Sequence, residues 1–402
     1  MRILSADKAT VSLLSGLEGL GHVCHVRAEL TADELPSAIA GYEILIVRST
    51  VVSAATIEAA DRLRLIIRAG AGTNTIDTQA AARRAVYVCN VPGKNAIAVA
   101  ELTLGLILSL DRNIPDNVEE LKRGMWDKTR FGRAAGLAGR HLGIVGLGQI
   151  GMAVAERARA FGMMIHVIGK TERSPATSRR LAEWQVVVEP DLTTLAAACD
   201  IVSFHLPAAQ ATKGIIGREL LAAVRPGAII INTARGDLID ERAVLEAIKD
   251  KGIRLGLDVF PDEPAEGKTP FVSALGQSPN VYGTHHIGAS TEQAQEAIAA
   301  EVIRIVEEFE RGNLIHCVNL EAQALGTATL FVRHHDEVGV LSELLALLKT
   351  AGINVEQMEN RIFRGAEAAE AIIHIQGEIA DDLLARLAAV NHVIGVSMAA
   401  NR

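Results

Sequence analysis

The chain is poor in cysteine, with four in 402 residues, and no two of them form a C-x-x-C pair. The spacing provides no zinc-binding or redox motif, so we expect no metal site. The four residues lie far apart among apolar neighbours, which predicts buried, reduced thiols and, by default, a cytoplasmic protein. They are Cys24, Cys89, Cys199 and Cys317.

Long uncharged apolar runs and an excess of positive charge are lacking as well. No such run approaches the roughly 20 residues that a membrane-spanning helix needs, and the N-terminal MRILSAD has the pattern of a short strand rather than of a signal peptide. The formal net charge of −8 argues against a nucleic-acid-binding surface. We therefore expect a globular protein of two or three domains whose partner is a small molecule, not a nucleic acid or a membrane.

The first ninety residues alternate between short runs of β-branched residues and helix-like stretches such as residues 10–20 and 54–60. This alternation predicts βαβ units on a parallel sheet. The expected strands are Ile3–Ser5, Val23–Val26, Ile44–Val47, Leu65–Ile67 and Val86–Val88. The stretch Asn95–Leu110 is apolar almost all round, which predicts a helix buried either in the core or at a subunit contact.

A second alternating block runs from Leu142 to about Thr284, and a long helix is expected at Thr291–Arg311. The expected strands of this block are Gly143–Val145, Ile165–Ile168, Val186–Val188, Ile201–Phe204, Ala228–Asn232, Arg254–Asp258 and Val281–Gly283. Residues 319–326 are polar and small, as in a linker. The order of elements after them is strand, helix, strand, strand, helix, strand, which predicts a small α+β sandwich over residues 327–402.

A GLGQIG motif follows the first strand of the second block and opens a predicted helix, the context that a dinucleotide-binding loop requires. Gly146 would make the tight turn, Gly148 would let a pyrophosphate approach the backbone, and Gly151 would let helix and strand pack closely. Gln149 and Ile150 begin the helix, whose free N–H groups and positive dipole favour phosphates. The motif therefore predicts a dinucleotide site.

An acidic residue at the end of the next strand would bind the ribose 2′-hydroxyl of NAD, but none stands there. The position falls at about Gly169, which Lys170 and Thr171 follow. Lys170 and Arg173 could instead neutralise the 2′-phosphate of NADP. Alternatively, both are solvated and an NAD ribose binds through the backbone and water. The cofactor is thus expected to be NAD, with NADP possible.

Three stretches each lie just past a predicted strand, where open α/β sheets bind their ligands. They carry Arg235 in IINTARGDLID, Asp258, Asp262 and Glu263 in LDVFPDEP, and His285 and His286 in GTHHIGAST. An arginine can hold a substrate carboxylate bidentately, and a histidine can take the hydroxyl proton as hydride leaves for a nicotinamide. A carboxylate can fix the tautomer of that histidine. Together these groups predict a dehydrogenase of a 2-hydroxy acid.

With these motifs the chain resembles the D-isomer-specific 2-hydroxyacid dehydrogenase family over nearly its whole length. GIVGLGQIG, INTARGDLID, LDVFPDEP and HHIGAST stand in the family's order and at its spacing. The resemblance implies that Arg235 binds the substrate carboxylate, Glu263 orients the base and His286 is the acid/base, while His285 stands where a proline is usual. Further cofactor contacts are implied at His205, Thr233, Asp258 and Gly288.

The family's fold implies two doubly wound parallel-sheet α/β domains with the active site in the cleft between them. A flavodoxin-like substrate domain would comprise residues 1–94 and 290–318, and a Rossmann nucleotide domain residues 95–289. The linker would be residues 319–326, and residues 327–402 resemble an ACT domain, a ferredoxin-like α+β module that senses ligands on amino-acid enzymes. The family also implies a homodimer or a homotetramer.

An ACT-like tail implies the branch of this family that oxidises 3-phosphoglycerate to 3-phosphohydroxypyruvate in the first step of L-serine biosynthesis. A phosphorylated substrate needs further cations, and the family places binding groups at matching positions here. The implied substrate-binding residues are Arg48, Ser49, Arg68, Gly70, Gly72, Asn95 and Lys128, the last on a loop that reaches across a dimer. The implied positions for an L-serine effector are His334, Asp336 and Asn354, unless the module only holds the oligomer together.

Two other functions stay open from the sequence. The first is a reductase of glyoxylate, hydroxypyruvate or another unphosphorylated keto acid, against which Arg48, Arg68, Lys128 and the tail argue. The second is a non-catalytic NAD(H)-sensing regulator, which the complete set of Arg235, Glu263 and His286 disfavours. A regulator would bind NADH tightly and turn over no hydroxy acid.

Overall fold

A computed structural model describes residues 1–170, 172–264, 269–321, 326–377 and 379–401. The chain forms two compact units, Met1–Asn319 and Leu320–Arg402, which are described separately below. Thr171 and residues 322–325 of the predicted linker lie outside the described residues. Within the described ranges, no helix is long and apolar enough to cross a membrane. The predicted domain boundaries stay predictions.

The first sheet of the larger unit is parallel throughout and has the strand order β2-β1-β3-β4-β5, the flavodoxin-like order. Its strands are β1 (Arg2–Ser5), β2 (Val23–Val26), β3 (Ile44–Val47), β4 (Leu65–Arg68) and β5 (Tyr87–Asn90). Its helices are α1 (Val11–Gly19), α2 (Leu35–Ala38), α3 (Ala54–Ala59), α4 (Thr78–Arg83) and α13 (Glu292–Glu310). This confirms the predicted parallel βαβ block.

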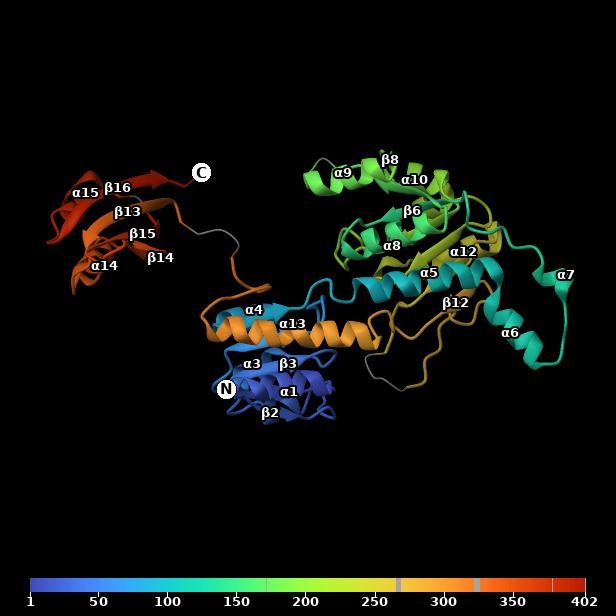
Figure 1. Ribbon diagram of the computed structural model, residues 1–402, viewed down its shortest axis with the longest axis horizontal. Coiled ribbons are helices and arrows are strands. Elements are labelled where there is room, and N and C mark those ends of the chain that lie inside the picture. The colour runs from blue at the N-terminus through green and yellow to red at the C-terminus, as the bar shows by residue number, and fades with distance from the viewer. Residues whose placement is uncertain (171, 265–268, 322–325, 378, 402) are drawn as a thin grey trace. The chain divides into compact units, whose positions relative to one another are not determined.

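Helices cover both faces of this sheet. Leu13 and Leu17 of α1 pack with Val302 and Ile305 of α13 in a single cluster on one face. Leu35, Ile57 and Ala80, from α2, α3 and α4, belong to the cluster on the other. In Figure 1, α13 (orange) returns to lie among elements from the beginning of the chain (blue). Burial on both faces explains why the central strands β3 and β4 are runs of apolar residues.

The second sheet is also parallel and has the order β12-β11-β10-β9-β6-β7-β8, a Rossmann order extended by one strand. Its strands are β6 (His141–Val145), β7 (Met164–Ile168), β8 (Val187–Glu189), β9 (Ile201–Phe204), β10 (Ile229–Asn232), β11 (Arg254–Leu257) and β12 (Val281–Gly283). Its helices are α5 (Ala96–Arg112), α8 (Gln149–Ala160), α9 (Pro175–Glu183), α10 (Leu192–Ala198), α11 (Arg218–Ala223) and α12 (Glu241–Lys251). The strand order reverses between β6 and β9, which is where such sheets bind nucleotides.

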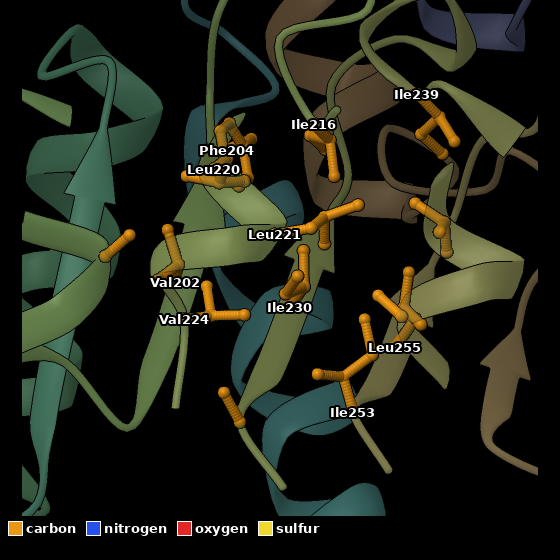
Figure 2. Packing of buried hydrophobic residues seen from close by; sticks show 14 of the residues in the cluster. Val202, Phe204, Ile216, Leu220, Leu221, Val224, Ile230, Ile239, Ile253 and Leu255 are labelled. Atoms are coloured by element: carbon orange, nitrogen blue, oxygen red, sulfur yellow. The ribbon is translucent and has the colours of Figure 1, made fainter. Parts of the chain in front are cut away.

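One face of this sheet packs on α10, α11 and α12. Figure 2 shows side chains of β9, β10 and β11 meeting Leu220 and Leu221 of α11. The other face packs on α5 and α8, where Leu106 and Leu110 approach Gly256 of β11 closely. The apolar character of α5 is therefore explained by its burial in the core of this domain. Its exposed Ile97, 54% accessible, leaves room for a subunit contact as well.

The segment between α5 and β6 carries two further helices, α6 (Ile114–Lys122) and α7 (Lys128–Phe131). The smaller unit contains β13 (Ala328–His335), α14 (Val340–Thr350), β14 (Asn354–Ile362), β15 (Ala368–Gln376), α15 (Asp381–Ala388) and β16 (Val393–Ala400). Its antiparallel sheet has the order β14-β15-β13-β16, and apolar residues of both helices pack with the sheet in one core. This confirms the predicted ferredoxin-like α+β fold.

Candidate active site

The glycine turn between β6 and α8 has the geometry of a pyrophosphate cradle. Gly146 has a φ of 101°, and a Cβ there would collide with the carbonyl of His205. A Cβ at Gly151 would collide with the carbonyl of Gly146, so helix and turn touch through bare backbone. A Cβ at Gly148 would meet nothing within 4 Å, which leaves open space beside the turn. Two glycines are thus needed for packing, and the third leaves room for a ligand.

The N-terminus of α8 faces the same turn. Gly148 occupies the N-cap position and provides no side chain to bond the first N–H groups of the helix. Those donors and the helix dipole favour an anion at this point. The residues present therefore fit the pyrophosphate of a dinucleotide, with Gln149 and Ile150 as the first residues of the helix.

Two other residues implied as cofactor contacts lie at strand ends nearby. His205 follows β9, and its Nε2 lies 2.9 Å from the Oγ of Ser203. Burial lowers the pKa of His205 to about 4, so the ring is neutral at physiological pH. Thr233 follows β10, and its hydroxyl lies 3.0 Å from that of Thr103 on α5. Their contacts with a cofactor stay predictions.

His286 and Glu263 form a close pair. His286 Nδ1 lies 2.5 Å from Glu263 Oε1, and Glu263 Oε2 accepts a hydrogen bond from the N–H of Phe260 at 3.3 Å. The contact at Nδ1 leaves Nε2 as the nitrogen that can exchange a proton with a substrate. His286 adopts a left-handed φ of 53°, a conformation that histidine tolerates better than β-branched residues do. This pairing supports His286 rather than the neighbouring His285 as the acid/base.

A buried carboxylate holds the loop that carries His286. Asp258 is 1% exposed, and it accepts hydrogen bonds from the hydroxyl of Thr284 at 2.6 Å and the N–H groups of Ile287 and Gly288 at 2.8 Å each. The N–H of His286 bonds to the Asp258 carbonyl at 2.8 Å. Asp258 and Gly288 therefore anchor the loop in this structure, and their contact with a cofactor stays a prediction.

Three arginines gather where strands of both sheets end. Arg48 follows β3, Arg68 ends β4 and Arg235 follows β10. Burial, and then the charges of Arg235 and Arg48, lower the pKa of Arg68 to about 10. In the described part of the chain, the buried Nε of Arg68 has no hydrogen-bond partner. Like charges held together with an unused donor are costly without an anion, so the cluster fits a multiply charged ligand.

The glycine loop after β4 lies against two of these side chains. A Cβ at Gly70 would collide with the guanidinium of Arg68, and a Cβ at Gly72 would lie 2.8 Å from Nη2 of Arg235. Arg48 Nη2 lies 3.4 Å from the hydroxyl of Ser290, just past the His286 loop. The structure thus brings together the arginines, this glycine loop and the segment around His286.

Asp7, which the sequence reasoning did not identify, organises the Arg48 loop. Its carboxylate accepts hydrogen bonds from the N–H groups of Arg48 at 2.6 Å and of Ser49 and Thr50 at 3.2 Å, and from the Ser49 hydroxyl at 2.7 Å. Burial alone would raise the pKa of Asp7, but these hydrogen bonds lower it below its ordinary value. Its signal in the sequence is an acid two residues after the end of β1, at the same edge of the sheet.

The remaining predicted substrate and effector positions lie on other elements. Asn95 is the N-cap of α5, without a side-chain capping bond. Lys128 begins α7 and lines a surface pocket formed by residues 117–132 alone. In the smaller unit, His334 is buried, with its Nδ1 2.7 Å from the carbonyl of His335 and its Nε2 3.1 Å from Oδ1 of Asn360. Asp336 is exposed after β13, and Asn354 donates to Glu356 at 2.7 Å.

A dinucleotide-binding sheet with a histidine–carboxylate pair and clustered arginines beside it is typical of dehydrogenases of anionic substrates. Residues 104–288 match the family model described as D-isomer specific 2-hydroxyacid dehydrogenase, NAD binding domain. The chain belongs to that family, and it is an NAD-dependent dehydrogenase.

The relatives and solved structures that resemble this chain are named for different substrates. A D-3-phosphoglycerate dehydrogenase of Methanocaldococcus jannaschii is 37% identical over 100% of this chain and 75% of its own length. A hydroxypyruvate reductase of Thermotoga maritima is 40% identical over 74% of this chain and 93% of its own. The D-lactate dehydrogenase of Aquifex aeolicus, solved with NAD and lactic acid, is 25% identical with a TM-score of 0.67, over 80% of this chain and 100% of its own.

Proposed function

We propose that this protein oxidises 3-phosphoglycerate to 3-phosphohydroxypyruvate with NAD, as a D-3-phosphoglycerate dehydrogenase in the first step of L-serine biosynthesis. The observation that carries the proposal is the convergence of Arg48, Arg68 and Arg235, which exceeds what a single substrate carboxylate needs. Relatives with this name match most of the chain, among them the one from Methanocaldococcus jannaschii. The relative that is a hydroxypyruvate reductase covers less of the chain, 74% against 100%.

In the proposed reaction each residue of the site has a separate role. Arg235 holds the substrate carboxylate, and His286 takes the hydroxyl proton at Nε2 while its Nδ1 stays on Glu263. Bound NAD supplies the hydride acceptor. Arg48, with Ser49, and Arg68 hold the phosphate and offset its charge. Asn95 and the loop that contains Gly70 and Gly72 complete the pocket for the remaining substrate oxygens.

The substrate assignment predicts a strong preference for the phosphorylated keto acid. We expect kcat/KM for 3-phosphohydroxypyruvate to exceed that for hydroxypyruvate and glyoxylate by at least about 100-fold, because each charge-assisted hydrogen bond to phosphate contributes roughly 1.5–3 kcal/mol. Initial rates of reduction test this. A preference for the unphosphorylated acids would make the protein a reductase of those acids. Tight NADH binding without any turnover would identify a non-catalytic regulator.

We further propose that the protein is a homodimer or a homotetramer in which a partner covers α6 and α7. Leu121, Met125 and Trp126 are 55%, 57% and 80% exposed there, next to Lys128, which would then serve the partner's substrate. The mass in solution should be two or four times 42.7 kDa, and Trp126→Glu should reduce it. Val11→Glu, at an equally exposed apolar site on α1, should not. A monomeric wild type would contradict the proposal.

We propose that the smaller unit binds L-serine near His334, Asp336 and Asn354, as its ferredoxin-like fold and the end-product role of serine suggest. Calorimetric titration of the full chain should show binding of L-serine but not of D-serine. Asp336→Ala should weaken that binding, because the carboxylate would pair with the amino group, whereas Glu337→Ala should leave it unchanged. No binding would mean that the unit serves only to assemble the oligomer.

We also propose a cytoplasmic location for the protein, which the reduced cysteines lead us to expect.

A further inference from the structure

Two cysteines that are far apart in the chain lie opposite each other in the larger unit. Cys89 belongs to β5, the edge strand of the first sheet, and Cys317 belongs to the segment that follows α13. The two residues form an antiparallel bridge. The N–H groups of Asn90 and Val318 make the flanking hydrogen bonds to carbonyls of the opposite segment, at 3.1 and 2.8 Å. The segment after α13 thus covers the edge of β5 at this point.

This bridge has the geometry that a disulfide requires. Because the hydrogen bonds flank it, the two cysteines are a non-hydrogen-bonded pair, in which opposed Cα atoms lie roughly 4.5 Å apart. A disulfide joins Cα atoms that are roughly 4.4–6.8 Å apart. The Cys317 thiol accordingly shares a hydrogen bond with that of Cys89, and this contact, together with burial, raises the pKa of Cys89. The two sulfurs are therefore already neighbours in the thiol form.

The segment around Cys317 is held in place by its neighbours on both sides. Nε2 of His316 lies 2.9 Å from Oε1 of Glu301 on α13. The side-chain amide of Asn319 makes two hydrogen bonds, each of 2.8 Å, with the backbone of residues 86–88. Because the folded chain fixes both thiols in contact, a reaction between them has a high effective concentration.

We propose that Cys89 and Cys317 form a reversible disulfide, which makes them a redox-sensitive cross-link between β5 and the segment after α13. The cross-link is independent of the substrate that the enzyme oxidises. In a reducing compartment both residues stay thiols, and the disulfide forms when the thiol pool is oxidised, as in other redox-sensing proteins.

The oxidant is a small disulfide of the glutathione type. The half-buried Cys317 loses its proton to water, attacks one sulfur of glutathione disulfide and releases one glutathione thiolate. Cys89 then loses its proton, attacks Sγ of Cys317 in the mixed disulfide and releases the second glutathione. Two protein thiols are oxidised, and one glutathione disulfide is reduced to two thiols. The second step is the slower one, since Cys89 is buried and its pKa is raised.

Oxidation of the native full-length protein in glutathione redox buffers tests the proposal. With excess glutathione disulfide, two of the four thiols should disappear, and a peptide map should join Cys89 to Cys317. The cross-link closes a long loop, so the melting temperature should rise by about 3–10 °C. Dithiothreitol should reverse both changes. Retention of all four thiols, a stable glutathione adduct on Cys317 or a disulfide between another pair would overturn the proposal.

Variants assign the effect to this pair. Cys317→Ala should abolish the rise in melting temperature on oxidation, and because the side chain is only half-buried the variant should fold. Cys89→Ala, at the buried partner, should abolish it as well. Cys24→Ala is the matched control, because Cys24 is also half-buried but faces Ile3 of β1 rather than a cysteine. It should respond to oxidation as the wild type does. A rise that persists in Cys317→Ala would contradict the assignment.

Discussion

His286→Ala is expected to lower kcat by about 100- to 10,000-fold, the range that general acid–base catalysis contributes. In the proposed mechanism this histidine accepts the substrate proton, and its Nδ1 lies 2.5 Å from Glu263 Oε1. Its removal leaves the glycine turn and the arginine cluster in place. Binding of NADH, measured by titration, should therefore change little. The rate of 3-phosphohydroxypyruvate reduction under saturating cofactor measures the loss.

The adjacent histidine provides the control for this experiment. His285 is exposed, like His286, and immediately precedes it, but the Glu263 carboxylate contacts His286. His285→Ala should keep kcat within about threefold of the wild type, since it removes no proton-transfer group. If the two variants exchanged these phenotypes, the assignment of the acid/base would be wrong. If neither lost activity, the proposed mechanism would fail.

Arg235→Gln is expected to lower kcat/KM by about 1,000-fold, because it removes both the charge and the fork that we propose to hold the substrate carboxylate. Arg235→Lys keeps the charge but not the planar fork. Its kcat/KM should lie between those of the wild type and Arg235→Gln, about 10- to 100-fold below the wild type. The loss should appear in KM as well as in kcat, since the arginine binds the ground state and orients it for hydride transfer.

The melting temperature distinguishes a loss of substrate binding in Arg235→Gln from misfolding of the variant. Burial is the main cause that lowers the pKa of Arg68, and repulsion by Arg235 is the second, so neutralising Arg235 removes an unfavourable interaction from the folded state. The melting temperature of Arg235→Gln should therefore be no lower than that of the wild type. Lower activity together with a sharply lower melting temperature would show that Arg235 has a structural role that the proposal does not include.

Much of the fold follows from local patterns. The apolar runs that predict strands at Ile44–Val47 and Ile201–Phe204 form β3 and β9 with the predicted bounds. Short-range differences remain: the strand expected at Val86–Val88 is β5, Tyr87–Asn90. Ala85 adopts a left-handed φ of 52° after α4, and pairing with β4 carries the strand on to Asn90, opposite Arg68. Pairing with a neighbour, which hydropathy does not encode, decided where this strand ends.

The glycine turn and the histidine–carboxylate pair were also readable from the sequence. In GLGQIG, Gly146 and Gly151 are needed for close packing and Gly148 leaves space for a ligand. The family resemblance pairs Glu263 with His286, and the two side chains lie 2.5 Å apart. The role of Asp258 was not readable, because a carboxylate after a strand has the same appearance whether it binds a ligand or accepts the N–H groups of Ile287 and Gly288. Only the position of the partner loop distinguishes these cases.

The sequence by itself determined the elements of this protein, the turn that fits a dinucleotide and the residue types of its chemistry, because these depend on spacing along the chain. Only the tertiary structure decided which of them meet. Asp7 holds the Arg48 loop because β1 lies beside β3 as well as β2, and Arg235 reaches Gly72 from another sheet. The order of strands and the packing of one sheet near another arise from contacts between residues far apart in the chain, 41 positions for Asp7 and Arg48 and 163 for Gly72 and Arg235, and no local pattern specifies those.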